Sequence, residues 1–191
     1  EIKEKNKKNG IFKSKFLNSN LKFHFNYDEK KLKIYNSNFR NKNLSFKNES
    51  TIIYHPFFYL NSVFKIKDVN ISFLKGLNLN KILKSKNFIK KINIDNEIIF
   101  KSNKFSNNLI DDLHLSINLA YGRATYSKKI LFWESVLICK GNINLLEEYP
   151  VLYFDCSVTS KNKKKFLKKF KIKHSNQNGL FKLNTKGNIN I

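Results

Sequence analysis

The chain has 191 residues, 41% of them apolar, which is enough material for one domain with its own core. Its formal net charge of +23 raises nucleic acid or an anionic membrane surface as a partner. No run approaches the roughly 18 to 20 uninterrupted apolar residues of a membrane-spanning helix, and no leader with a small-residue cleavage site opens the chain. Because it begins at Glu1 and lacks methionine, we expect residues 1–191 to be a single β-rich domain from a longer polypeptide that carries any membrane anchor.

Alternation of apolar and polar residues with a period of two dominates the chain and predicts strands with one buried and one solvated face. The cleanest strands run from Leu21 to Tyr27 and from Leu113 to Leu119. Since register is fixed wherever one face is apolar, we expect both to turn their apolar residues to the same side of a shared sheet. Further strands are predicted by the apolar positions Ile92, Ile94, Ile98 and Phe100, by Leu152, Phe154, Cys156 and Val158, and by Phe181, Leu183, Thr185, Ile189 and Ile191.

Two stretches depart from simple alternation. Between Val63 and Phe73 the apolar phase changes, which predicts a β-bulge near Lys67 and Asp68. The run Ile130–Cys139 is apolar on nearly every position, which predicts one strand covered on both faces.

Turn residues and helical spacing complete the expected fold. Turns are predicted at residues 28–31, 41–43, 127–129 and 146–150, spaced for a meander of antiparallel hairpins. The segments Asn78–Ile89 and Ser160–Phe170 have loosely helical apolar spacing and predict short amphipathic helices. The expected fold class is therefore all-β: a long antiparallel meander, forming a curled sheet or open groove, with two short amphipathic helices.

The polar residues form no recognisable catalytic, cofactor or metal site. The four histidines, at positions 24, 55, 114 and 174, lack metal-ligand spacing and are expected at the surface. The carboxylate pairs at 111–112 and 147–148 are adjacent residues, which point to opposite faces of a strand. A glycine-rich phosphate loop and a nucleophile elbow are also lacking. We therefore expect no enzyme activity, no cofactor and no bound metal.

The two cysteines are too few for a disulfide framework and lack metal-ligand spacing. Cys139 and Cys156 lie at equal distances from the centre of the link at 146–150, so a symmetric hairpin would make them cross-strand neighbours. An oxidising compartment would then permit a disulfide, and the sequence leaves open whether they pair.

The positive charge is weak evidence for nucleic acid. Of the 37 basic residues only Arg40 and Arg123 are arginine, and the abundance of lysine, asparagine, isoleucine and phenylalanine is typical of AT-rich codons. Proteins that read nucleic-acid grooves rely on the bidentate arginine fork. The aromatic residues also lie on the strand phase opposite the lysines, unlike a single-strand binding surface. We therefore expect no nucleic-acid partner.

The segment Gly141–Phe170 combines two strands and a helix in a fixed order. A strand closes at Gly141-Asn142-Ile143, a link ends at Pro150, the strand Val151–Val158 follows, and a short helix carries Phe166-Leu167-Lys168-Lys169-Phe170. This order resembles a pattern of the AsmA-like family of bacterial envelope proteins. The closing Gly187–Ile191 resembles the glycine-led strand of that family, and Phe64–Leu83 resembles its step from a strand into a short helix.

The resemblance implies a repeating β-groove lipid-transfer protein of the Gram-negative envelope, periplasmic and anchored to the inner membrane through a segment outside this chain. Its expected role is lipid transport and outer-membrane biogenesis, with this chain as a groove segment that binds or conducts phospholipid acyl chains between inner and outer membrane. The alternatives are a structural β-domain with a closed core, which exposure of the aromatic face would distinguish, and a basic nucleic-acid-binding module. The expected lipid-facing residues, called the apolar track below, are Leu21, Phe23, Phe25, Tyr27, Ile92, Ile94, Ile98, Phe100, Leu113, Leu115, Ile117, Leu119, Leu152, Phe154, Val158, Phe181 and Leu183.

Overall fold

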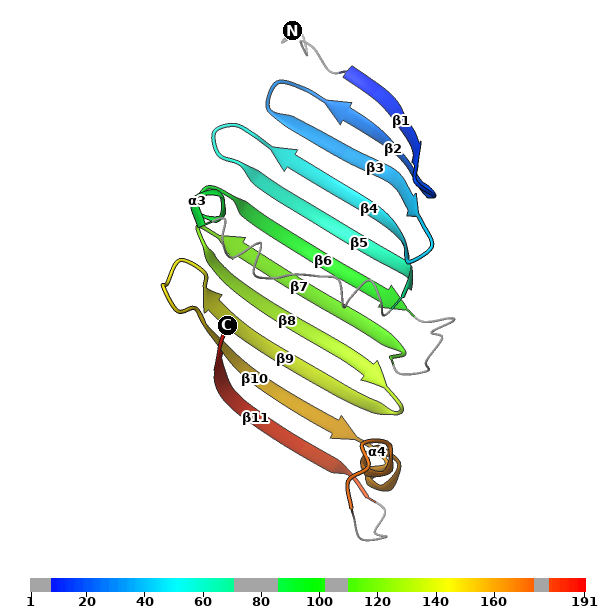
Figure 1. Ribbon diagram of the computed structural model, residues 1–191, viewed down its shortest axis with the longest axis vertical. Coiled ribbons are helices and arrows are strands. Elements are labelled where there is room, and N and C mark those ends of the chain that lie inside the picture. Colours follow the sequence, from blue (N-terminus) through cyan, green and yellow to red (C-terminus); the bar gives the residue numbers. More distant parts are fainter. Residues whose placement is uncertain (1–7, 71–85, 102–109, 174–178) are drawn as a thin grey trace, which may run out of the picture.

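One sheet of eleven strands, in sequence order, makes up almost all of the protein (Figure 1). The computed structural model describes residues 8–70, 86–101, 110–173 and 179–191. The expected all-β fold with two short helices is confirmed, and the sheet is open, with β1 and β11 at its two edges. The strands are β1 (Lys8–Phe16), β2 (Ser19–Tyr27), β3 (Lys31–Arg40), β4 (Leu44–Ile53), β5 (Tyr59–Val69), β6 (Asn93–Lys101), β7 (Asp112–Ala120), β8 (Arg123–Phe132), β9 (Ser135–Asn144), β10 (Val151–Ser160) and β11 (Phe181–Asn190).

Sequence neighbours pair throughout the sheet, as the meander prediction requires, and all but one pair is antiparallel. The exception is β5 with β6, which run in parallel with Tyr59 opposite Asn93 and Ile66 opposite Phe100. A parallel pair needs a connection that returns to the starting end of the sheet. The chain between β5 and β6 is long enough for that return, and its described end is the helix α3 (Lys86–Ile89).

The second predicted helix forms as α4 (Lys163–Lys169). It begins where Asn162 caps it, because the side-chain oxygen of Asn162 accepts a hydrogen bond from the backbone N–H of Lys165 at 2.9 Å. Phe166 and Leu167 are buried against Phe132, and these three residues form the hydrophobic cluster that fastens α4 to the sheet. Of the first predicted helix, Asn78–Ile89, residues 86–89 are helical and the remainder lies outside the described residues.

Two of the predicted turns follow from a short side chain that bonds the backbone ahead of it. The Asp28 carboxylate accepts from the N–H groups of Lys30 and Lys31, both at 2.9 Å. Asn41 does the same for residues 43 and 44, and residues 145–150 join β9 to β10 as expected.

Two predictions about the chain between 127 and 139 are wrong. Residues 127–129 are no turn, because β8 runs through them. The run Ile130–Cys139 is two strands, β8 and β9, joined at Trp133 and Glu134, whose φ angles are 45° and 62°. Two consecutive left-handed residues are typical of a tight hairpin turn, which usually contains asparagine or glycine. A tryptophan and a glutamate in that conformation give no turn signal in the sequence.

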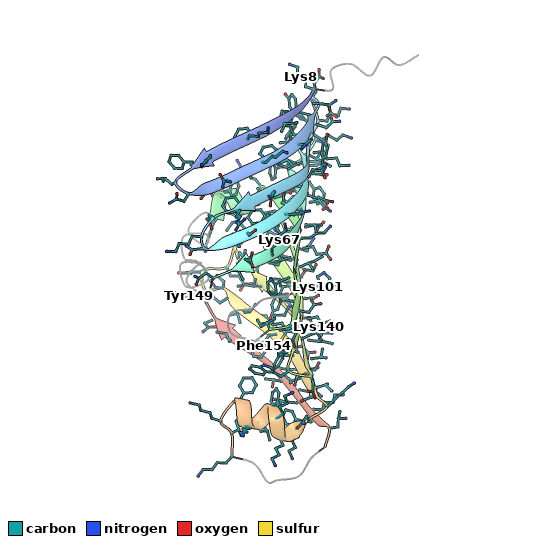
Figure 2. The ribbon with its side chains drawn as sticks, turned by 90° about the vertical axis from the view of Figure 1, so that its right-hand side faces the viewer. Lys8, Lys67, Lys101, Lys140, Tyr149 and Phe154 are labelled. Atoms are coloured by element: carbon teal, nitrogen blue, oxygen red, sulfur yellow. A yellow bond between two sulfur atoms is a disulfide. The ribbon has the colours of Figure 1, made fainter. Side chains whose placement is uncertain are left out.

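The predicted bulge at the end of β5 is confirmed. Ser45 lies opposite Asp68 while Phe46 lies opposite Ile66, so Lys67 is the extra residue. Further register shifts interrupt the ladders between β2 and β3 and between β3 and β4. Bulges increase the local twist of a sheet, and in Figure 2 the strands β1 to β5 curl away from the long axis of the sheet.

Candidate functional site: the apolar face of the sheet

Register places the apolar track on one face of the sheet. Directly opposed residues point to the same face, so the pairing of Leu113 with Phe100, and of Phe100 with Ile66, carries one face from β7 to β5. Followed in both directions, the ladders bring every strand residue of the track to that face, including the residues from Leu21 to Tyr27 and from Leu113 to Leu119 that we expected to share it. Ile92 lies just before β6 and is buried. We call this surface the apolar face.

Strand residues outside the predicted apolar track extend the apolar face. On β1, β3 and β4 its aromatic rings stack across strands, with centroids 5.0 Å apart both between Phe12 and Phe23 and between Phe39 and Phe46. The signal in β3 and β4 is the same alternation, but bulges and polar residues shorten it. The added apolar residues are Phe12, Leu32, Ile34, Phe39, Phe46, Ile52, Leu60, Phe64, Ile66, Ile130, Leu137 and Ile143.

Much of the apolar face is accessible to solvent. Residues of the central strands, such as Leu115 and Ile117, are half-buried, and toward the edges Phe12, Leu183 and Ile189 are 45%, 48% and 55% exposed. Of the described helices, α4 packs onto this face, at the end of β8 to β11 (Figure 2). A contiguous apolar surface of this size is typical of a binding surface.

The opposite face is polar and basic. In Figure 2, Lys101 and Lys140 lie toward one side of the sheet and Phe154 toward the other. Partly exposed ion pairs lie on this face. Lys186 pairs with Asp155 at 3.3 Å, and Lys65 pairs with Glu49 at 3.8 Å. We call it the polar face.

Shallow hollows lie on the polar face of the described strands. One, of about 670 Å³, lies over β8 to β11 beside the Lys186–Asp155 pair. Another, of about 460 Å³, lies over β1 to β3 and is lined by cationic and amide side chains: Lys13, Lys15, Lys22, Arg40, Asn20 and Asn38. These cationic side chains could meet an anionic surface.

The predicted surface positions of the histidines fit the structure where it describes them. His24 and His114 lie on the polar face, and His114 contacts Glu97 at 2.5 Å. His55 lies in the exposed link before β5, and His174 lies outside the described residues. Within those residues, no three histidine, cysteine or acidic side chains gather closely enough to hold a metal ion.

On the polar face, the carboxylate of Asp95 accepts hydrogen bonds from side chains of the two neighbouring strands. Tyr59 donates to Asp95 at 2.5 Å, and Asn118 donates to the other oxygen of the same carboxylate at 2.5 Å. The two hydrogen bonds hold the pKa of Asp95 below its ordinary value, and the bond to Asp95 raises the pKa of Tyr59. Since Tyr59, Asp95 and Asn118 belong to β5, β6 and β7, the arrangement braces the parallel step.

The cysteines meet on the apolar face. Cys139 and Cys156 are directly opposed on β9 and β10 and form a disulfide, with Cα atoms 4.1 Å apart. The symmetric hairpin expected from the sequence is therefore the observed one.

Polar residues also interrupt the apolar face, and the sequence did not reveal them as a group. Lys128 is half-buried on it between Leu115 and Cys139. On β4 to β6, residues Asn48, Ser50, Ser62 and Asn96 form a polar island among apolar neighbours. Their only signal in the sequence is a polar residue on the apolar phase, as between Ile94 and Ile98.

Comparison of the chain with protein-family models, with curated proteins and with solved structures found no match. None of the helices in the described ranges is long and apolar enough to cross a membrane.

Proposed function

We propose that the apolar face binds lipid acyl chains, and that the chain is a groove segment of an AsmA-like envelope protein. In this proposal phospholipid chains lie along the face in the periplasm, on their way between inner and outer membrane, while the parent protein is anchored outside this segment. No bond is made or broken. The observation that carries the proposal is the mainly apolar face that runs across all eleven strands and is accessible to solvent over much of its area.

Two features favour lipid over the alternatives. A structural domain with a closed core would bury the apolar face, whereas Phe12 is 45% exposed and Leu183 48% exposed on it. A surface for nucleic acid would place aromatic rings among cations, whereas here the rings and most lysines lie on opposite faces.

The disulfide supports the proposed compartment. Disulfides persist in oxidising compartments such as the bacterial periplasm and are rare in the cytosol of mesophiles. The bond between Cys139 and Cys156 is therefore compatible with a groove exposed to the periplasm.

Native mass spectrometry of the purified chain, with lipid extraction as a second readout, tests the proposal. Wild type should carry phospholipid, and longer acyl chains should bind more tightly because each buried methylene contributes about 0.8 kcal/mol. Ile117→Asp should abolish binding, since it places a short unpaired charge on the face. Phe23→Asp should act in the same way.

The matched control is Ser127→Asp, which adds the same charge to the polar face of β8 opposite Lys140. It should leave lipid binding unchanged, and so should Lys22→Gln. Wild type without lipid, or folded Ile117→Asp that loads lipid normally, would refute the proposal in favour of a structural domain.

A further inference from the structure

The polar island crosses three neighbouring strands on the apolar face. Ser50 lies opposite Ser62, and Ser62 lies opposite Asn96, so β4, β5 and β6 each contribute a polar side chain to one row. Asn48 lies two residues from Ser50 on the same face of β4. On β5 the island is flanked by apolar residues, with Leu60 before Ser62 and Phe64 after it.

Two of the four island residues, Asn48 and Ser50, have hydrogen-bond partners within the protein. Ser50 donates to the side-chain oxygen of Asn48 at 2.7 Å, and the side-chain nitrogen of Asn48 donates to the carbonyl of Val63 at 3.2 Å. Both the oxygen and the nitrogen of the Asn48 side chain are therefore hydrogen-bonded within the protein.

The other half is unsatisfied. Ser62 is 2% exposed, and its hydroxyl has no hydrogen-bond partner. The side-chain oxygen of Asn96, on the adjacent strand in direct register, is also buried and without a partner. Folded proteins keep few such atoms, because a buried polar atom that loses water without gaining a partner is destabilising. Two of them side by side indicate that a partner completes the site.

The chemistry of these two atoms defines the partner. An amide oxygen can only accept, so the group that meets Asn96 must donate, whereas the Ser62 hydroxyl can donate or accept. Ionisable side chains are lacking in the island, so a charged group would be desolvated without a counter-charge. A neutral hydroxyl fits both atoms, because it can donate to Asn96 while its oxygen accepts from the Ser62 hydroxyl. Asn96 itself is half-buried, so the island borders the accessible part of the face.

We propose that Asn96 and Ser62 bind the free hydroxyl of a neutral lipid of the diacylglycerol class. This inference rests on the proposed function, because the acyl chains of that lipid lie on the apolar residues around the island. The apolar face alone would bind any chain, and the island adds a preference for lipids that carry a hydroxyl. Water is the other source of an O–H donor and is distinguished by experiment.

Competition by native mass spectrometry on the full chain measures this preference, with 1,2-dioleoylglycerol against its 3-O-methyl ether, which cannot donate. Wild type should prefer the alcohol by about tenfold, the effect of one well-made hydrogen bond to a buried acceptor. Asn96→Leu should bind both lipids equally and keep its affinity for the ether. Ser62→Ala should weaken the preference, and Ser116→Ala, on the polar face of β7, should retain it.

Folding does not confound the test, because removing an unpartnered buried polar atom leaves thermal stability unchanged or raised. Equal binding of alcohol and ether by wild type, or a preference that survives in Asn96→Leu, would mean that water completes the island, and would overturn the inference while the proposed function stands. Binding of neither lipid would overturn both.

Discussion

The two ends of the sheet hold their shape by different means. In the described ladders from β6 to β11 the register is uninterrupted, a disulfide joins β9 to β10, and α4 buries Phe132 on the apolar face. The ladders from β2 to β5 contain three register shifts, and Phe16 at the β1 edge is 70% exposed. Apart from α4, the described residues form no second layer on the sheet, so these local contacts determine which region is stiff. The C-terminal strands should be the stable region and the N-terminal strands the adaptable one.

The largest expected effect is the loss of the α4 cluster. Phe132→Ala should lower the unfolding free energy by about 3–5 kcal/mol, because Phe132 is buried and its ring packs on Phe166, Phe170 and Trp133. Phe12→Ala, the matched change near the other edge, should cost about 1 kcal/mol because that ring is half exposed. Urea unfolding followed by circular dichroism measures both, and equal losses would mean that the two ends are alike.

The disulfide should contribute next. Cys139→Ala combined with Cys156→Ala should lower stability by about 3 kcal/mol, since the bond closes a loop with a sequence separation of 17. Hydrogen exchange should then rise in β9 and β10 while β2 to β4 keep their wild-type rates. A reducing agent should reproduce the loss in wild type and have no effect on the double variant.

Glycine substitutions compare the two regions at the level of the backbone. A Cβ at Gly141 would approach the Tyr126 ring to 2.5 Å and press on the backbone carbonyl of Tyr153, so Gly141→Ala should cost about 1–3 kcal/mol. Gly10→Ala meets the movable ring of Phe25 on an edge strand and should cost less than about 1 kcal/mol. Thermal denaturation of the two variants measures the stability that each substitution removes. A larger loss of stability in Gly10→Ala would mean that the N-terminal strands are the stiff region.

The smallest expected effect is a pH dependence at the boundary between the regions. Because the pKa of Asp95 is lowered in the folded state, its contribution is present above the ordinary carboxyl value of 3.8 and is lost as pH falls through the lowered folded value. Tyr59→Phe removes one of the hydrogen bonds responsible, so its stability should change less than that of wild type on acidification. The difference should stay under about 1 kcal/mol on this solvated face. Tyr153→Phe, at an exposed ring, should follow the wild-type curve.

The residues that share a face of the sheet could be predicted from the sequence, because a strand with one buried face has apolar side chains at every second position. The bulge at Lys67 could be predicted for the same reason, since the extra residue shifts that phase. Other features of the fold produce no periodic pattern in the sequence. The turn at Trp133 and Glu134 uses residues that rarely adopt a left-handed backbone, and the parallel step depends on the path of a connection. The polar island depends on the parallel pairing of β5 with β6, which brings Asn96 beside Ser62.

The parallel step between β5 and β6 also sets the polarity of the two edges. In a purely antiparallel meander of eleven strands, the first and last strands would point the same way. One parallel pair reverses everything after it, so β1 and β11 run in opposite directions (Figure 1). Two such sheets related by simple translation would meet with antiparallel edges, and their apolar faces would lie on the same side. A further sheet of the same design could therefore extend this one by antiparallel pairing at its edge.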